Sequence, residues 1–95
     1  MVRIMGEGQY KAAKGLIKVK VNVRQGLIGG IVISGDFFLY PEDKLWEMEK
    51  MLIGVEAERE KVLAAVRRFY GENRVLSPGV APEDFAEAVM KAVEK

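Results

Sequence analysis

Residues 16–24 alternate strictly between apolar and polar side chains, and no other feature limits the possible folds as strongly. Ile17, Val19, Val21 and Val23 fall on one side, and Lys18, Lys20, Asn22 and Arg24 on the other. This period of two predicts a β-strand with one buried face, because successive side chains of a strand point to opposite faces. A shift of one residue would bury the lysines, so the pairing of this strand should be well specified.

The neighbouring segments indicate partners for this strand. Gln25-Gly26 is typical of a tight turn and predicts an antiparallel hairpin. The next strand, residues 27–34, is apolar on both faces, which favours a central place in the sheet with cover on both sides. Upstream, residues 10–13 are either a first edge strand or an extended lead.

A sharp corner follows, at residues 35–38, with the sequence GDFF. Gly35 permits backbone angles closed to other residues, and Asp36 is a turn residue that caps the corner in preference to a general acid or base. Of Phe37 and Phe38, one is expected in the core, and the other is either covered by a helix or left for a partner. Lys11 and Lys14 could meet phosphates, but lysines at a sheet edge more often discourage aggregation.

Three helices are predicted after the corner. Pro41 opens the first, over residues 42–53, and Gly54 ends it. Trp46 is expected to be part of the core, half-buried, on the flank of its apolar stripe. The second helix covers residues 56–70 and ends at Gly71, and Pro82 opens the last one. Strands followed by helices predict one α+β domain over residues 1–95: a small antiparallel sheet of two to three strands with three helices packed on one face.

The composition excludes several functions. The 95 residues include no cysteine, histidine or threonine, and the only serines are Ser34 and Ser77. Ser-His and Cys-His catalysis and thiolate metal sites are therefore excluded, and no catalytic or metal-binding residue is assigned. No apolar run approaches the ~20 residues that span a bilayer, and no signal peptide is recognisable. We therefore expect a cytoplasmic protein without a membrane partner.

The charges are distributed unevenly along the chain. The net charge is only +1, but residues 1–40 hold six basic and two acidic residues, and residues 41–95 hold nine and twelve. The strand half is thus cationic, and an ordinary solvated sheet face explains this best. Nucleic-acid binding through Lys18, Lys20 and Arg24 is the weakest hypothesis, because so small a net charge argues against a dedicated nucleic-acid binder.

The sequence from Gly8 to Val55 resembles the C-terminal accessory domain of lipoate–protein ligases. The matching features are Lys14-Gly15 before the alternating strand, its end in a glycine turn at residues 21–26, the GDFF corner followed by Pro41, and Leu-x-Gly at residues 52–54. The tail RVLSPGVAPEDFAEAVMKAV, residues 74–93, is also similar to the last segment of that domain.

The resemblance implies a function in protein lipoylation. These ligases activate lipoate with ATP to lipoyl-AMP and transfer it to a lysine of a lipoyl domain. Nucleotide and lipoate are held by the large domain, so the resemblance implies no cofactor bound by this chain alone, although lipoate and ATP belong to the complex. Some archaea hold the accessory domain on a separate chain, which forms a heterodimer with the large catalytic subunit and is needed for adenylation rather than for transfer.

We therefore expect a non-catalytic accessory subunit whose partners are the large catalytic subunit and, indirectly, lipoyl-domain proteins. The remaining apolar and charged features are the candidate partner-binding residues, together with the cationic strand face: Gly35, Asp36, Phe37, Phe38, Lys11 and Lys14. The alternative is a stand-alone module that binds a small ligand or a protein and has no ligase partner.

Overall fold

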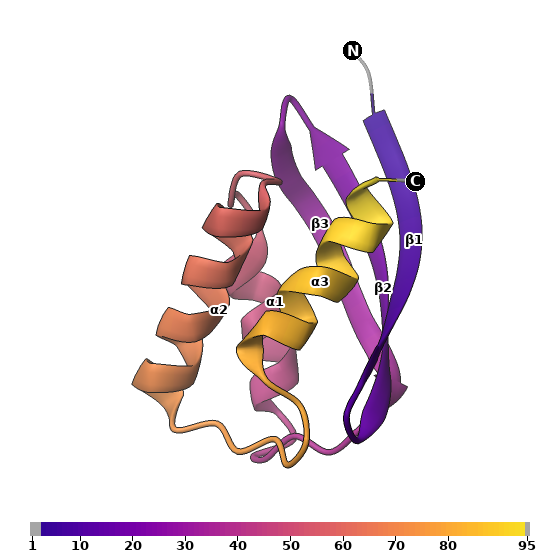
Figure 1. Ribbon diagram of the computed structural model, residues 1–95. Coiled ribbons are helices and arrows are strands. Elements are labelled where there is room, and N and C mark those ends of the chain that lie inside the picture. Colours follow the sequence, from indigo (N-terminus) through magenta and orange to yellow (C-terminus); the bar gives the residue numbers. More distant parts are fainter. Residues whose placement is uncertain (1–2, 95) are drawn as a thin grey trace.

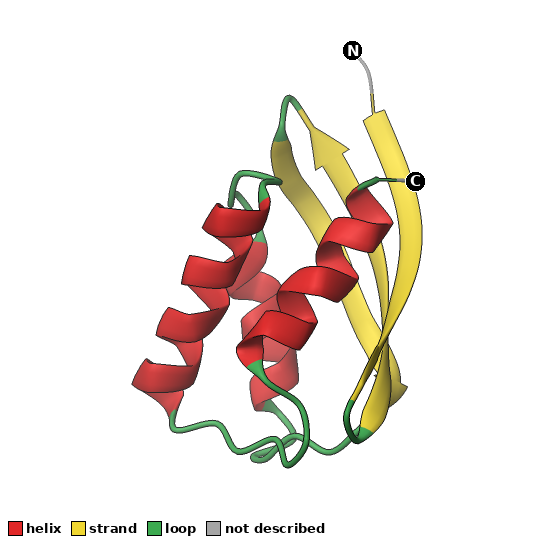
Figure 2. Cartoon of the chain, viewed as in Figure 1, coloured by secondary structure: helices red, strands yellow, loops and turns green. Residues whose placement is uncertain are grey.

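The computed structural model describes residues 3–94, which form a three-stranded sheet followed by three helices (Figure 1). In chain order the elements are β1 (Arg3–Ala12), β2 (Gly15–Arg24), β3 (Leu27–Asp36), α1 (Lys44–Leu52), α2 (Arg59–Asn73) and α3 (Pro82–Val93). All three helices lie on one face of the sheet, and the other face is open (Figure 2). The predicted α+β architecture is confirmed.

The sheet is antiparallel in the order β1-β2-β3, so the alternating strand lies at its centre. The apolar side chains of β2 face the helices and are buried, and its lysines lie on the open face. The prediction of a central, doubly covered place for residues 27–34 is wrong. β3 is an edge strand, and Val32 is 57% exposed because nothing covers the open face.

β1 is longer than the sequence indicated. It begins at Arg3 rather than near Tyr10, and it pairs with β2 along its whole length. Gly6 and Gly8 conceal it in the sequence, because glycine is depleted in strands. At Gly8 the backbone of α3 comes so close that an added Cβ would lie 2.6 Å from the carbonyl carbon of Lys91. The glycine therefore permits helix and strand to pack in direct contact.

The helix boundaries differ from the predicted ones at both ends of α1 and of α2, and α2 begins at Arg59 rather than at residue 56. α1 begins at Lys44, because Pro41 belongs to a turn in which the Lys44 N–H donates to the Pro41 carbonyl at 3.0 Å. α2 does not end at Gly71 but continues to Asn73, whose side-chain amide donates to the Phe69 carbonyl at 3.0 Å. A glycine inside a helix costs only about 1 kcal/mol relative to alanine, and these contacts offset that cost.

The core lies between the inner face of the sheet and the helices. Apolar side chains from all six elements line it, and the largest fully buried ones are Phe85, Ile17, Ile28, Met48, Leu52, Val19, Val21, Val62, Val66 and Val89. Trp46 is not among them: it is 68% exposed, so the expectation of a half-buried core position is wrong. Within residues 3–94, no helix is long and apolar enough to cross a membrane.

Candidate partner-binding surface

The GDFF corner joins the end of β3 to the loop before α1, at the end of the molecule where β1 also turns into β2 (Figure 1). Gly35 has a φ of 135°, and an added Cβ would overlap the carbonyl group of Leu16. Gly15, with a φ of 145°, approaches Asp36 in the same way, and its added Cβ would lie 2.5 Å from the Asp36 carbonyl oxygen. Gly35 thus shapes the corner by allowing two backbones to approach.

The two phenylalanines of the corner have different environments, as predicted. Phe37 is half-buried and packs edge-to-face on Phe85, with ring centroids 5.4 Å apart. Phe38 is 65% exposed and stacks on Tyr40, with centroids 6.3 Å apart and ring planes within 6° of parallel. Phe37 therefore anchors the corner to α3, and Phe38 remains free on the surface.

Tyr40 and Leu76 extend this exposed apolar surface. Their backbones form an antiparallel bridge with two hydrogen bonds, from Tyr40 N–H to the Leu76 carbonyl at 2.8 Å and back at 2.9 Å. Residues directly opposite in such a pair place their side chains on the same side. Phe38, Tyr40 and Leu76, all exposed, are called the corner patch below. Sequence reasoning missed Tyr40 and Leu76, because only the fold brings their two loops together.

A buried hydrogen-bond chain holds the loop that carries Leu76. The Ser77 hydroxyl donates to the Val80 carbonyl at 2.6 Å and also contacts the Tyr70 hydroxyl at 2.6 Å. Because the single hydroxyl hydrogen of Ser77 is used on Val80, Tyr70 is the donor to Ser77. Burial raises the pKa of the Tyr70 phenol.

The side chain of Asp36 does not stabilise the corner, and the two candidate lysines lie near it. Asp36 is exposed, and its carboxylate makes no hydrogen bond or ion pair within residues 3–94, so the expected cap of the corner is not formed. Lys11 on β1 and Asp36 on β3 are both paired with Leu16 of β2. Their Cα atoms are therefore two strand spacings, or about 10 Å, apart. Lys14 lies in the β1–β2 turn, where its N–H donates to the Gly79 carbonyl at 3.1 Å.

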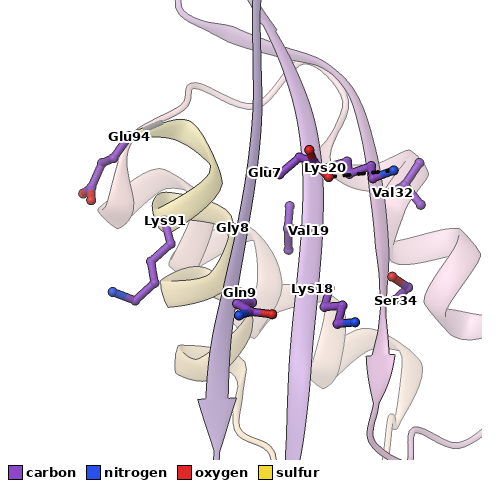
Figure 3. Close-up of a pocket in the computed structure, with 10 residues that line it drawn as sticks. All are labelled: Glu7, Gly8, Gln9, Lys18, Val19, Lys20, Val32, Ser34, Lys91 and Glu94. Carbon is purple, nitrogen blue, oxygen red and sulfur yellow. Dashed lines mark ion pairs between the residues drawn. The ribbon is translucent and has the colours of Figure 1, made fainter.

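The open face of the sheet forms a second surface. A shallow hollow there is lined by Lys18, Lys20, Val32 and Ser34, and it reaches Gln9 on β1 (Figure 3). Lys20 pairs with Glu7 across the strands at 3.8 Å, and both side chains are well exposed. Such an exposed pair contributes little to stability, so these charges remain available to a partner.

Neither surface holds a constellation for bond-making chemistry. Within residues 3–94, no three acidic side chains gather to form a metal site. The corner patch is apolar and exposed, and the hollow is open, with polar and apolar lining in about equal parts. Exposed apolar side chains that lie together are typical of protein–protein contacts, so the corner patch is a candidate interaction surface.

The chain belongs to the family described as the bacterial lipoate protein ligase C-terminus, whose model matches residues 7–89. The predicted resemblance is therefore confirmed for most of the chain.

Two relatives, both from the archaeon Thermoplasma acidophilum, are close over nearly their whole length. One is lipoate-protein ligase A subunit 2, which is 42% identical over 88 residues, covering 93% of this chain and 90% of that protein. The other is a solved structure from a study of an archaeal lipoylation system, a bi-partite lipoate protein ligase and its E2 lipoyl domain. It superposes with a TM-score of 0.85 at 42% identity and covers 93% of this chain and 97% of that one.

Proposed function

We propose that this protein is the non-catalytic accessory subunit of a two-chain lipoate–protein ligase. Its partner is a large catalytic subunit that activates lipoate with ATP to lipoyl-AMP. The observation that carries the proposal is the 42% identity to subunit 2 of such a ligase, over nearly the full length of both chains. A relative that is itself a small separate subunit, rather than one domain of a long enzyme, favours a separate subunit here as well.

The composition supports an accessory function. The chain has no histidine, cysteine or threonine, so a nucleophile with an adjacent imidazole base cannot be assembled from it. Lipoate and ATP are assigned to the large subunit, because the family resemblance places both there. What this chain offers is a rigid sheet with two exposed surfaces, the corner patch and the open face.

A subunit of this kind acts on the equilibrium of its partner. By binding more tightly to the closed form of the large subunit, it increases the population of that form. Closure excludes water from the activated carboxyl group, which protects a reactive acyl-adenylate from hydrolysis. Lipoyl-domain proteins are then indirect partners, because they receive the lipoyl group from the large subunit.

The test is an adenylation assay with the catalytic subunit from the same organism. Lipoate and ATP are supplied, and pyrophosphate release is measured with and without this chain. We expect activation to depend on this chain, and transfer from chemically prepared lipoyl-AMP to a lipoyl domain to proceed without it. Equal activation in both mixtures would contradict the proposal, as would ATP turnover by this chain alone with lipoate.

A further inference from the structure

The two edges of the sheet differ in how far the rest of the chain bonds to their backbone groups. The outer edge of β3 is covered: Ile28 N–H donates to the Val55 carbonyl at 2.9 Å, and Gly54 N–H donates to the Ile28 carbonyl at 2.7 Å. Farther along, the Glu49 carboxylate of α1 accepts from Ile33 N–H at 2.6 Å. Such cover prevents another strand from pairing with this edge.

The hydrogen bond to Glu49 also fixes the direction of the neighbouring backbone groups of β2 and, through the unbroken pairing of β2 with β1, those of β1. Because Ile33 N–H points away from β2, Ile33 and its partner Val19 form a non-hydrogen-bonded pair. The backbone groups of Val19 must then point to the other side, where they bond to Gly8 of β1. It follows that the residues between, Glu7 and Gln9, direct their N–H and C=O groups out of the sheet.

By the same alternation, the outward backbone groups of β1 belong to Met5, Glu7, Gln9 and Lys11. Over the described part of this strand from Met5 onward, no backbone group bonds to anything except β2. A row of free donors and acceptors along an edge strand is a template for one more strand.

The surroundings of this edge favour an extended segment over a second copy of the same chain. The last turn of α3 crosses β1 at Gly8, and Lys91 and Glu94 lie beyond the strand (Figures 1 and 3). A second copy paired through its own β1 would bring its own α3 to the same place. Helix axes need 8–10 Å between them, roughly twice the spacing of adjacent strands. An extended segment that carries no packed helix of its own would not clash with α3.

We propose that the free edge of β1 binds an extended segment of the catalytic subunit, which adds a fourth strand to the sheet. This inference rests on the proposed function, since it names the place where that partner binds. Glu7, Gln9 and Lys11 lie in a row on the open face beside this edge. The complementary segment therefore carries a basic residue opposite Glu7 and an acidic residue opposite Lys11, because opposite charges on facing strands attract.

Amide hydrogen exchange of this chain, free and bound to the catalytic subunit, tests the proposal residue by residue. We expect the outward amides of Glu7, Gln9 and Lys11 to exchange at least tenfold more slowly in the complex. The inward amides of Gly8 and Tyr10, already bonded to β2, should change much less. Strand addition predicts this alternation, whereas side-chain contact across the open face does not.

A proline variant provides a second measurement. Gln9→Pro removes one outward donor, and proline is tolerated in edge strands where its nitrogen faces away from the sheet. We expect association at least tenfold weaker, with Gln9→Ala as the matched control that keeps the N–H. If Gln9→Pro does not fold, as judged by circular dichroism, the exchange pattern of the unaltered chain decides.

The outcomes separate this inference from the proposed function. A complex that forms without alternating protection on β1 overturns the strand addition and leaves the proposed function intact. Protection of β1 that appears in the free chain as its concentration rises indicates pairing with a second copy, and overturns the proposal as well. No association at all with the catalytic subunit overturns both.

Discussion

The hydrogen bonds of Ser77 hold the 74–81 loop in place. Ser77 is 9% exposed and is the only buried polar residue among residues 5–94, whose side-chain burial the structure describes. It accepts from the Tyr70 hydroxyl and donates to the Val80 carbonyl, both at 2.6 Å. Tyr70 in turn packs against Phe85, which supports Phe37 of the corner. A short polar chain and three aromatic rings thus connect the exposed corner to the interior.

Tyr70→Phe should lower the free energy of unfolding by about 1 kcal/mol, since it removes one partly buried hydrogen bond. Ser77→Ala should cost more, because it leaves both the Tyr70 hydroxyl and the Val80 carbonyl without this partner. Urea denaturation followed by circular dichroism measures both. Tyr10→Phe is the control, because Tyr10 is also half-buried and its hydroxyl makes no hydrogen bond within residues 3–94. Equal values for the two tyrosine variants would contradict this account.

Arg67 controls the titration of Glu83, to which it donates at 2.5 Å from α2 to the first turn of α3. This hydrogen bond holds the pKa of Glu83 below its ordinary value. The associated stability is present above the ordinary carboxyl pKa and is lost as the pH falls through the lowered value. Arg67→Gln should therefore raise the pKa of Glu83, which a carbon-13 NMR titration of the carboxyl group measures.

Arg68→Gln is the matched control for this titration. Arg68 pairs with Glu72 on its own helix rather than with α3, so its loss should leave the pKa of Glu83 unchanged. A Glu83 titration that is the same with and without Arg67 would show that the backbone at the start of α3, rather than the ion pair, causes the shift.

At the scale of elements, β1 and α3 pack in direct backbone contact at Gly8, where a Cβ would have no room. Gly8→Ala would place a methyl group 2.6 Å from the Lys91 carbonyl carbon and 2.9 Å from Ala92 Cα. Both are backbone atoms, so α3 must move. We expect the free energy of unfolding to fall by about 1–3 kcal/mol, as overpacking usually costs.

Gly29→Ala is the control for Gly8→Ala. The nearest atom to its added Cβ lies 3.5 Å away, which is an ordinary contact, so the change should stay within about 0.5 kcal/mol. Chemical denaturation of the two variants under the same conditions makes the comparison. A Gly8→Ala protein as stable as Gly29→Ala would mean that α3 shifts without cost.

The elements also show what the sequence could and could not predict. Period-two alternation identified β2, and Pro82 with acids in the first turn identified α3, because these signals are local. β1 was missed because glycine is depleted in strands, and Gly8 is required by a contact with α3, which is far away in the sequence. The predicted central position of β3 was wrong because Val32 is apolar yet exposed. The sequence alone does not reveal whether the second face of a sheet is covered.

The candidate partner-binding surface was also only partly predictable from the sequence. The GDFF motif indicated the corner, and the division between Phe37 and Phe38 followed from their adjacency. Tyr40 and Leu76 could not be found, since a bridge between residues 36 positions apart leaves no local signal. Which of these residues contact the catalytic subunit stays a prediction.

For the molecule as a whole, the exposed large apolar side chains within residues 3–94 do not lie evenly over the surface. Phe38, Tyr40 and Leu76 gather at one end. The others are distributed singly over β1, β3 and α1 and its C-terminal end: Met5, Leu27, Val32, Trp46 and Ile53. The three side chains of the corner patch are not part of the buried core, so the patch is not needed to form it. We therefore expect the corner patch to contribute to binding, beside the strand edge proposed above.

Phe38→Ser should weaken association with the catalytic subunit by about tenfold or more, because aromatic anchors contribute a large share of interface energy. Its melting temperature should barely change, since the ring is 65% exposed and stacks on Tyr40, which is also exposed. Phe37→Ser should instead lower the melting temperature, because Phe37 packs on the fully buried Phe85. Ile53→Ser, 53% exposed at the other end of the molecule, is the control for losing surface apolar area. Calorimetric titration measures the affinity for the catalytic subunit. Equal affinities for Phe38→Ser and Ile53→Ser would contradict a contribution of the corner patch to binding.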